Sequence, residues 1–201
     1  MQAGGKIVFG EYEWRVLDIQ DNTALIITEN TIEWHPYHNA YVDITWADCS
    51  LRKYLNGEFY ERFSEADKAK VIPVTNKNLD NQWYGTNGGA DTQDKIFLLS
   101  VEEAACKYFG DSSEKLYNRG KNHRYWFHGK PDENNSKRSA KRLNESWYSW
   151  WWLRSPGRVG VKAVYIHGNG DIGIQGNNIL KGNISEGGHG GGVRPALWVS
   201  L

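Results

Sequence analysis

Glycine and tryptophan are concentrated in the last third of the chain, and this distribution limits the folds open to it. Twelve of the 22 glycines lie between Gly157 and Gly192, directly after the tryptophan-rich run at residues 147–152. Glycine-rich stretches favour turns and short strands over long helices. We therefore expect a loop-rich fold that carries aromatic surfaces.

The size and charge of the chain narrow the functional classes. A length of 201 residues suits one domain, so we expect residues 1–201 to form a single unit. The 24 basic and 24 acidic side chains balance, so overall charge gives no reason to expect a nucleic acid or an anionic membrane as partner. Two cysteines are too few for a disulfide framework, which leaves the redox compartment open.

Membrane insertion and secretion are not indicated by the sequence. No apolar run reaches the roughly eighteen residues needed for a membrane span, and residues 1–6 lack the features of a signal peptide. We expect a soluble chain, cytoplasmic or phage-associated by default.

The first half of the chain predicts a β-meander followed by short helices. Capping sequences predict three helical segments, the first of which should end at Asn56-Gly57. The expected strands are Lys6 to Phe9, Tyr12 to Leu17, Thr23 to Thr28 and Lys95 to Leu99. The expected helix starts are Thr45 to Asp48, Ser64 to Asp67 and Ser100 to Glu103. Residues 30–44 predict an aromatic loop without an assigned function.

The sequence shows no catalytic motif. It contains no H-E-x-x-H, G-x-S-x-G or phosphate-binding P-loop sequence. Cys49 falls on an apolar helical stripe and Cys106 just beside another, so both are interpreted as structural. We expect no cofactor, although a loop with Asp80, Asp91 and Asp94 leaves a structural calcium ion open.

One segment is locally basic. Residues 114–145 contain nine basic and four acidic side chains, with Tyr125, Trp126 and Phe127 among them. Such a segment could bind nucleic acid through phosphates and stacked bases, but a solvated loop is the commoner origin, so we do not expect nucleic acid as the main partner.

The C-terminal part predicts a hairpin and a recognition surface. Strands are expected at Val161 to Ile166 and Asp171 to Gln175, with outward polar and aromatic side chains on glycine-permissive loops. Such side chains suit adaptable recognition of a protein or glycan. The predicted ligand-binding residues are Tyr165, His167, Asn169, Asp171, Ile174, Asn177, Asn178, Asn183 and His189.

Two motifs carry a family resemblance. The sequences Trp151-Trp-Leu-Arg-Ser-Pro-Gly157 and Gly192-Val-Arg-Pro-Ala-Leu-Trp198 resemble the C-terminal signature of an uncharacterised bacterial domain family common in gut Firmicutes and their phages. Further similar segments extend the resemblance over nearly the whole chain. They are Phe9-Gly10, Trp14 to Leu17, Cys49 to Asn56 and Asp94 to Ser100.

The resemblance implies an α+β fold of the C-type-lectin-like, formylglycine-generating-enzyme type. Short helices would pack on antiparallel sheet, and residues 146–201 would hold the framework and the ligand-binding region. The implied framework residues are Trp151, Trp152, Arg154 and Arg194. The oxidase activity is not transferred because both cysteines precede residue 107, and the calcium-binding motifs of sugar-binding C-type lectins are absent.

The same fold also serves as the variable product of diversity-generating retroelements. Adenine substitution in Asn codons yields residue types found from Tyr165 to His189, although Lys162, Gln175, Lys181 and Glu186 do not fit that origin. We therefore expect a non-enzymatic recognition domain. The alternatives are a degenerate metal-dependent oxidase related to the formylglycine-generating enzymes and nucleic-acid binding through residues 114–145.

Overall fold

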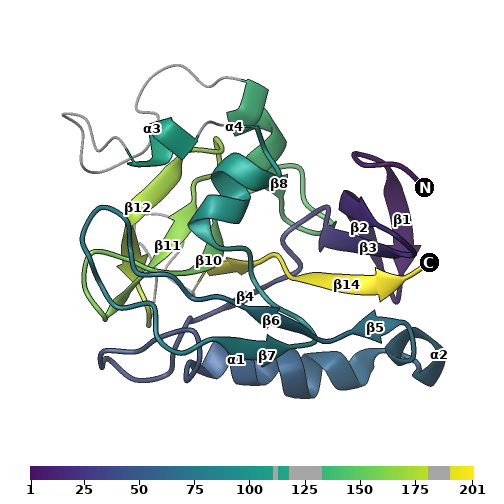
Figure 1. The fold of residues 1–201 in the computed structure, drawn as a ribbon, viewed down its shortest axis with the longest axis horizontal. Helices are drawn as coiled ribbons and strands as arrows, with labels where there is room; N and C mark the ends of the chain where they lie inside the picture. Colours follow the sequence, from purple (N-terminus) through teal and green to yellow (C-terminus); the bar gives the residue numbers. More distant parts are fainter. Residues whose placement is uncertain (111–112, 118–132, 181–190) are drawn as a thin grey trace.

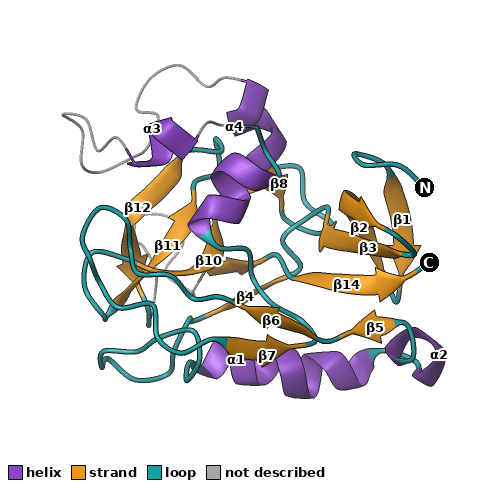
Figure 2. Ribbon diagram, viewed as in Figure 1, coloured by secondary structure: helices purple, strands orange, loops and turns teal. Residues whose placement is uncertain are grey.

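The protein is a mixed α+β structure with mostly antiparallel sheets and few short helices, as expected (Figure 1). The computed structural model describes residues 1–110, 113–117, 133–180 and 191–201. Within these residues, two five-stranded sheets contain most of the strands, and Figure 2 shows them side by side. The helical segment that begins with α1 runs along one edge of both sheets in that view.

The first sheet contains the predicted meander. Its strand order is β1-β2-β3-β14-β5, and every neighbouring pair is antiparallel. The strands are β1 (Lys6–Phe9), β2 (Tyr12–Gln20), β3 (Thr23–Thr28), β5 (Val71–Ile72) and β14 (Ala196–Ser200). The apolar side chains of β3 and β14 are almost all buried, so the C-terminal strand completes the interior of the N-terminal sheet.

The second sheet contains the predicted hairpin, with strand order β12-β11-β10-β13-β4. Its strands are β4 (Glu33–His35), β10 (Trp151–Pro156), β11 (Lys162–Ile166), β12 (Ile172–Asn178) and β13 (Gly191–Val193). All six residues of β10 are buried. The prediction of residues 30–44 as loop is wrong at β4, because its three residues pair with β13 at the sheet edge.

The first helical segment differs from its prediction at both ends. Helix α1 (Ser50–Tyr54) begins after Cys49, whose sulfur accepts a hydrogen bond from Arg52 N at 3.4 Å, instead of at Thr45. The segment then continues through the π-helical turn η1 (Leu55–Phe59) and η2 (Tyr60–Arg62). Asn56 does not end the helix because its side chain is bound to the backbone of Lys95 and Ile96.

The other two helix starts are confirmed. Ser64 Oγ accepts a hydrogen bond from Asp67 N at 3.1 Å and caps α2 (Glu65–Lys68). Ser100 and Glu103 form a reciprocal capping box before the π-helical turn η3 (Glu103–Lys107). The remaining short elements are β6 (Val74–Asn76), β7 (Thr92–Asp94), α3 (Ser113–Tyr117), α4 (Glu133–Arg138), β8 (Ala140–Lys141) and β9 (Tyr148–Ser149).

The predicted strand Lys95 to Leu99 is wrong. This segment makes only one isolated bridge, from Phe97 to Ala196 in β14. It is nevertheless interior, since residues 96–99 are buried and belong to one hydrophobic cluster with side chains from both sheets. A run of apolar residues predicts burial here but not strand pairing. In the described part of the chain, no helix combines the length and apolar character needed to cross a bilayer.

Candidate functional site

The predicted recognition face is partly interior. Tyr165 and Ile174 are 1% and 0% exposed, so their predicted outward orientation is wrong. The cause is a glycine that makes room for a ring: a Cβ on Gly173 would lie 2.1 Å from Tyr165 Cε1. The Tyr165 ring therefore covers the backbone of β12 and is itself covered by Trp150, whose ring centroid lies 5.5 Å away.

Asp171 is also buried, contrary to the prediction, because it fastens the turn between β11 and β12. Its carboxylate accepts hydrogen bonds from Asn135 Nδ2 at 2.8 Å and from Asn169 Nδ2 at 3.0 Å. Asn135 belongs to α4 and is fully buried. The Asp171 carboxylate thus links α4 to the turn and does not face a ligand.

The accessible members of the predicted face are fewer. Asn169 is exposed, and His167, Asn177 and Asn178 are half-buried. The other two predicted residues, Asn183 and His189, lie outside the described residues. The described residues on either side of positions 181–190 contact the aromatic loop at residues 30–44. Ile179 O accepts a hydrogen bond from His38 N at 3.2 Å, and Gly191 pairs with His35.

The four framework residues are all in the interior. Trp151, Trp152 and Arg194 are fully buried, and Arg154 is 4% exposed. Arg194 Nε donates to Thr28 O at 2.8 Å, and its guanidinium carbon lies 5.0 Å from the ring centroid of Trp151. Burial, with a smaller contribution from Arg15, lowers the pKa of Arg194 to about 9.

The basic segment is divided between interior and surface. Arg138 is fully buried and donates from Nε to Gly170 O at 2.9 Å, so it cannot reach a phosphate. Lys137 forms an exposed ion pair with Glu133. Lys141 is exposed and Arg142 half-buried, and these two reach the surface next to aromatic rings. Tyr125, Trp126 and Phe127 lie outside the described residues.

These two cations and four side chains near them form what we call the aromatic surface: Trp34, Lys141, Arg142, Trp147, Tyr148 and His167. The β8–β9 hairpin builds it, because Lys141 pairs with Tyr148 across the two strands. Trp147 and Tyr148 are 42% and 56% exposed. The Trp34 ring meets Trp147 edge-on with centroids 5.9 Å apart.

The aromatic surface combines rings, cations and a hollow. The Arg142 guanidinium carbon lies 4.5 Å from the ring centroid of Trp34, and Lys141 Nζ lies 5.7 Å from that of Tyr148. Next to them is a hollow of about 270 Å³, lined by Trp147, Tyr148, Ser149, Trp150, His167 and Gly168. Of these residues only His167 was predicted. Trp147 and Tyr148 directly precede the Trp-rich strand, but nothing in the sequence separates exposed tryptophans from buried ones.

A second hollow lies on α1 and η1, beside the aromatic loop. It measures about 620 Å³ and is lined by His35, Pro36, Asn39, Ser50, Lys53, Tyr54, Gly57 and Glu58. The rings of His35 and Tyr54 stack with centroids 4.2 Å apart. Burial, and then the 2.5 Å hydrogen bond that Tyr54 donates to Glu33, raise the pKa of Tyr54.

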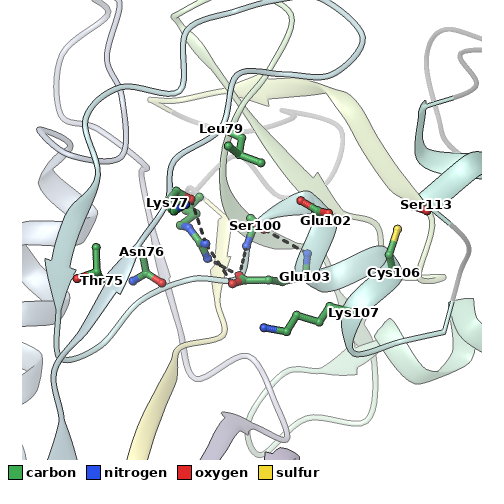
Figure 3. Close-up of a pocket in the computed structure, with 11 residues that line it drawn as sticks. Thr75, Asn76, Lys77, Leu79, Ser100, Glu102, Glu103, Cys106, Lys107 and Ser113 are labelled. Carbon is green, nitrogen blue, oxygen red and sulfur yellow. Dashed lines mark hydrogen bonds and ion pairs between the residues drawn. The ribbon is translucent and has the colours of Figure 1, made fainter.

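A third hollow, which we call the Arg154 pocket, has a charged floor (Figure 3). It measures about 620 Å³ and is lined by Thr75, Asn76, Lys77, Leu79, Ser100, Glu102, Glu103, Cys106, Lys107, Ser113 and Arg154. Arg154 pairs with both carboxylate oxygens of Glu103 and donates to Leu98 O at 2.8 Å. Burial alone would raise the pKa of Glu103, but the charge and hydrogen bonds of Arg154, together with the Ser100 backbone hydrogen bond and the Lys107 charge, keep that pKa below its ordinary value.

The two cysteines occupy different environments and form no pair. Cys49 is fully buried, and burial raises the pKa of its thiol to about 12, in agreement with its predicted core position. Cys106 is half-buried on the wall of the Arg154 pocket. The two are not joined by a disulfide.

The calcium hypothesis finds no geometric support in the described residues. Asp94 is buried and its carboxylate is bound by Arg52, Trp46, Asn76 and Thr92, with Arg52 Nε at 2.6 Å. Asp80 and Asp91 instead accept hydrogen bonds from Gly88 N and Asn78 N. No group of three acidic, histidine or cysteine side chains in the described part of the chain is placed to hold a metal ion.

Comparison with known proteins gives a family but no activity. No curated protein and no solved structure matches the chain. Residues 21–201 match a domain of unknown function, DUF6273, which covers both sheets except β1 and β2. The chain therefore belongs to the DUF6273 domain family.

Proposed function

We propose that this protein is a non-enzymatic recognition domain of C-type-lectin-like fold that binds its ligand on the aromatic surface. The observation that carries the proposal is the exposure of Trp147 and Tyr148, two large rings at the end of a short hairpin braced by a buried framework. Exposed aromatic groups with polar neighbours are typical of binding sites, because rigid rings give contact area at a small cost in conformational entropy.

The chemistry of the aromatic surface suits a glycan. A sugar ring has an apolar face that can stack on Trp147 or Tyr148, and hydroxyl groups that can bond to His167 in the same hollow and to Asn169, two residues further along the chain. Asn169 is held in place by its bonds with Asp171, so its side chain is preorganised. A protein ligand is the alternative for the same surface.

We also propose that the domain is the variable product of a diversity-generating retroelement. If the domain is its variable product, substitutions should fall on accessible positions such as His167, Asn169 and Asn178, and should spare the buried Tyr165, Asp171 and Ile174. An adjacent reverse transcriptase gene and a near-repeat of the codons for the C-terminal region would support this origin. Related chains that vary at Tyr165 or Ile174 would contradict it.

The test of the proposed function is an array of immobilised oligosaccharides probed with the full chain. Trp147→Ala and Tyr148→Ala should each abolish the signal of any bound glycan, whereas Tyr117→Ala should retain it. Tyr117 is the matched control because it is as exposed as Tyr148, at 56%, but lies on α3. Equal loss in all three variants, or binding that survives both changes at the aromatic surface, would refute this site.

One observation favours a second candidate function, the binding of single-stranded nucleic acid. Lys141 and Arg142 lie beside Tyr148 and Trp34, and the combination of cations with exposed rings is used to hold phosphates and stacked bases. A single-stranded oligonucleotide should then be retained at low salt and released as salt rises. Retention unchanged by Lys141→Met together with Trp147→Ala would exclude the aromatic surface as its site.

A further inference from the structure

The Arg154 pocket is built by four separate parts of the chain. The segment that leaves β6 contributes Lys77 and Leu79, the turn η3 contributes Cys106 and Lys107, and α3 and β10 supply Ser113 and Arg154. The segment that leads into this turn is tied to β10, since Val101 N donates to Ser155 Oγ at 2.9 Å and Arg154 N donates to Leu99 O at 3.0 Å. The floor is thus held by the sheet, and π-helical turns of this kind are frequent at functional sites.

The balance of charge in the pocket is positive. Among the described residues that line it, the charged side chains are Lys77, Lys107 and Arg154 against Glu102 and Glu103. Arg154 and Glu103 neutralise each other, which leaves two lysines against one carboxylate. Within the described residues neither lysine forms an ion pair. Lys107 Nζ does interact with Tyr108, 5.1 Å from the ring centroid, but an ammonium group has three N–H donors, so donors remain for a ligand.

The pocket also has an apolar wall and a useful size. Leu79 is 52% exposed and lines the pocket, and Figure 3 shows this side chain above Ser100 and Glu102. A volume of about 620 Å³ lies in the range of small-molecule sites, about 300–1,000 Å³. A ligand therefore meets cations at one part of the pocket and an apolar surface at another.

We propose that the Arg154 pocket binds a small organic anion, a carboxylate or phosphate ester on an apolar body, independently of the aromatic surface. The anionic group bonds to Lys77 and Lys107, and the apolar body rests on Leu79. The Arg154–Glu103 pair forms a neutral floor, because both terminal guanidinium nitrogens of Arg154 and both carboxylate oxygens of Glu103 are bound within the protein. Arg154 Nε is buried and has no hydrogen-bond partner among the described residues.

The alkylation rate of Cys106 provides a readout of ligand binding in the pocket. Its thiol lines the pocket, and Figure 3 shows the sulfur on the side of the turn that faces Ser113 and Glu102. Cys49 is buried with a pKa of about 12, so iodoacetamide should alkylate Cys106 selectively in the folded protein. The rate of that reaction reports occupancy of the pocket.

The probes are benzoate, phenyl phosphate and the uncharged benzyl alcohol, added to the full chain. For a Kd of about 1 mM, either anion at about 10 mM fills nine-tenths of the pocket and should slow alkylation about tenfold. Benzyl alcohol should leave the rate unchanged within about twofold. Protection by benzoate alone or by phenyl phosphate alone supports the proposal and identifies the anionic group; protection by neither, or equal protection by the alcohol, overturns it.

Charge variants test the same site with little risk to the fold, because both lysines are exposed. Lys77→Met with Lys107→Met should raise the Kd of the protecting anion at least about tenfold, judged from the ratio of alkylation rates with and without the anion. Lys53→Met is the matched control, since Lys53 is an exposed lysine in the hollow on α1 and η1. Protection that persists in the double variant, or is lost equally in the control, overturns the proposal.

Discussion

The hairpin β11–β12 and the turn η3 differ from each other in a way that their sequences do not show. The hairpin is rich in glycine, asparagine and aromatic residues and predicts a surface, yet Tyr165, Asp171 and Ile174 are buried. The turn η3 predicts an ordinary structural helix, yet Glu103, Cys106 and Lys107 line a hollow of about 620 Å³. The hairpin, whose sequence predicts an exposed surface, thus has buried side chains, whereas η3, whose sequence predicts a structural helix, lines a hollow.

The difference lies in what the glycines do. In an exposed loop, glycine supplies backbone freedom, but Gly173 and Gly191 instead supply space. A Cβ on Gly191 would lie 2.3 Å from Trp152 Nε1, as one on Gly173 would lie 2.1 Å from Tyr165. When a chain contains many large rings, glycine opposite a ring is as much a packing residue as leucine is elsewhere.

The sharpest test of the comparison is Tyr165→Ala. Removing this buried ring leaves a cavity against Gly173 and should destabilise the fold by about 4 kcal/mol in urea unfolding. Tyr148→Ala, which removes the same side chain from the aromatic surface, should cost less than about 1 kcal/mol. Similar losses of unfolding free energy in the two variants would mean that the Tyr165 side chain is not buried against β12.

The next largest effect is expected at the floor of the Arg154 pocket. Arg154→Met removes one partner of a largely buried ion pair and leaves the Glu103 carboxylate uncompensated, which should cost about 3 kcal/mol. The measurement is again urea unfolding at neutral pH. Arg158→Met is a suitable control because Arg158 is an exposed arginine just beyond the same strand. If Arg154→Met lowered the free energy of unfolding by less than Arg158→Met does, the Arg154–Glu103 ion pair would not stabilise the fold.

A smaller effect should appear as a dependence of stability on pH. The Glu103 pKa is lowered in the folded state, so its stabilising contribution is complete above the unfolded value of 4.5 and is lost as the pH falls through the folded pKa. The stability difference between the wild type and Glu103→Gln should therefore shrink from about pH 5 to about pH 3. A difference that stays constant over this range would show that the carboxylate is not held ionised by Arg154.

The smallest effect on stability is expected at the aromatic surface. Trp147→Ala removes one edge-on ring contact with Trp34 and should cost about 1 kcal/mol or less. Its thermal unfolding midpoint should thus stay near that of the wild type, while glycan binding on the array is lost. A large fall in the midpoint would show that the Trp147 ring braces the hairpin and is not free for a ligand.

The sequence predicts best where the signal is local. The reciprocal bonds of Ser100 and Glu103 follow from residue types three apart, and the meander follows from turns between β-branched runs. The π-helical turn at Leu55 to Phe59 could not be predicted, because it depends on Asn56 bonding to a segment forty residues later in the chain.

The candidate sites were harder to predict than the fold for the same reason. Trp147 lies in a bend before β9, whereas Trp151 belongs to β10, which is buried on both faces, and the local sequence does not distinguish these two environments. The Arg154–Glu103 pair joins residues 51 positions apart, and neither motif that contains them indicates the other.

The position of β14 has a consequence for biosynthesis. This strand pairs with β3 on one side and β5 on the other. The first sheet therefore lacks one of its interior strands until residues 196–200 have left the ribosome. The meander emerges long before and exposes an unpaired edge at β3, a form open to association with other nascent chains. Stable folding must therefore wait for this late segment, and truncation before Ala196 should yield an insoluble product instead of a shortened domain.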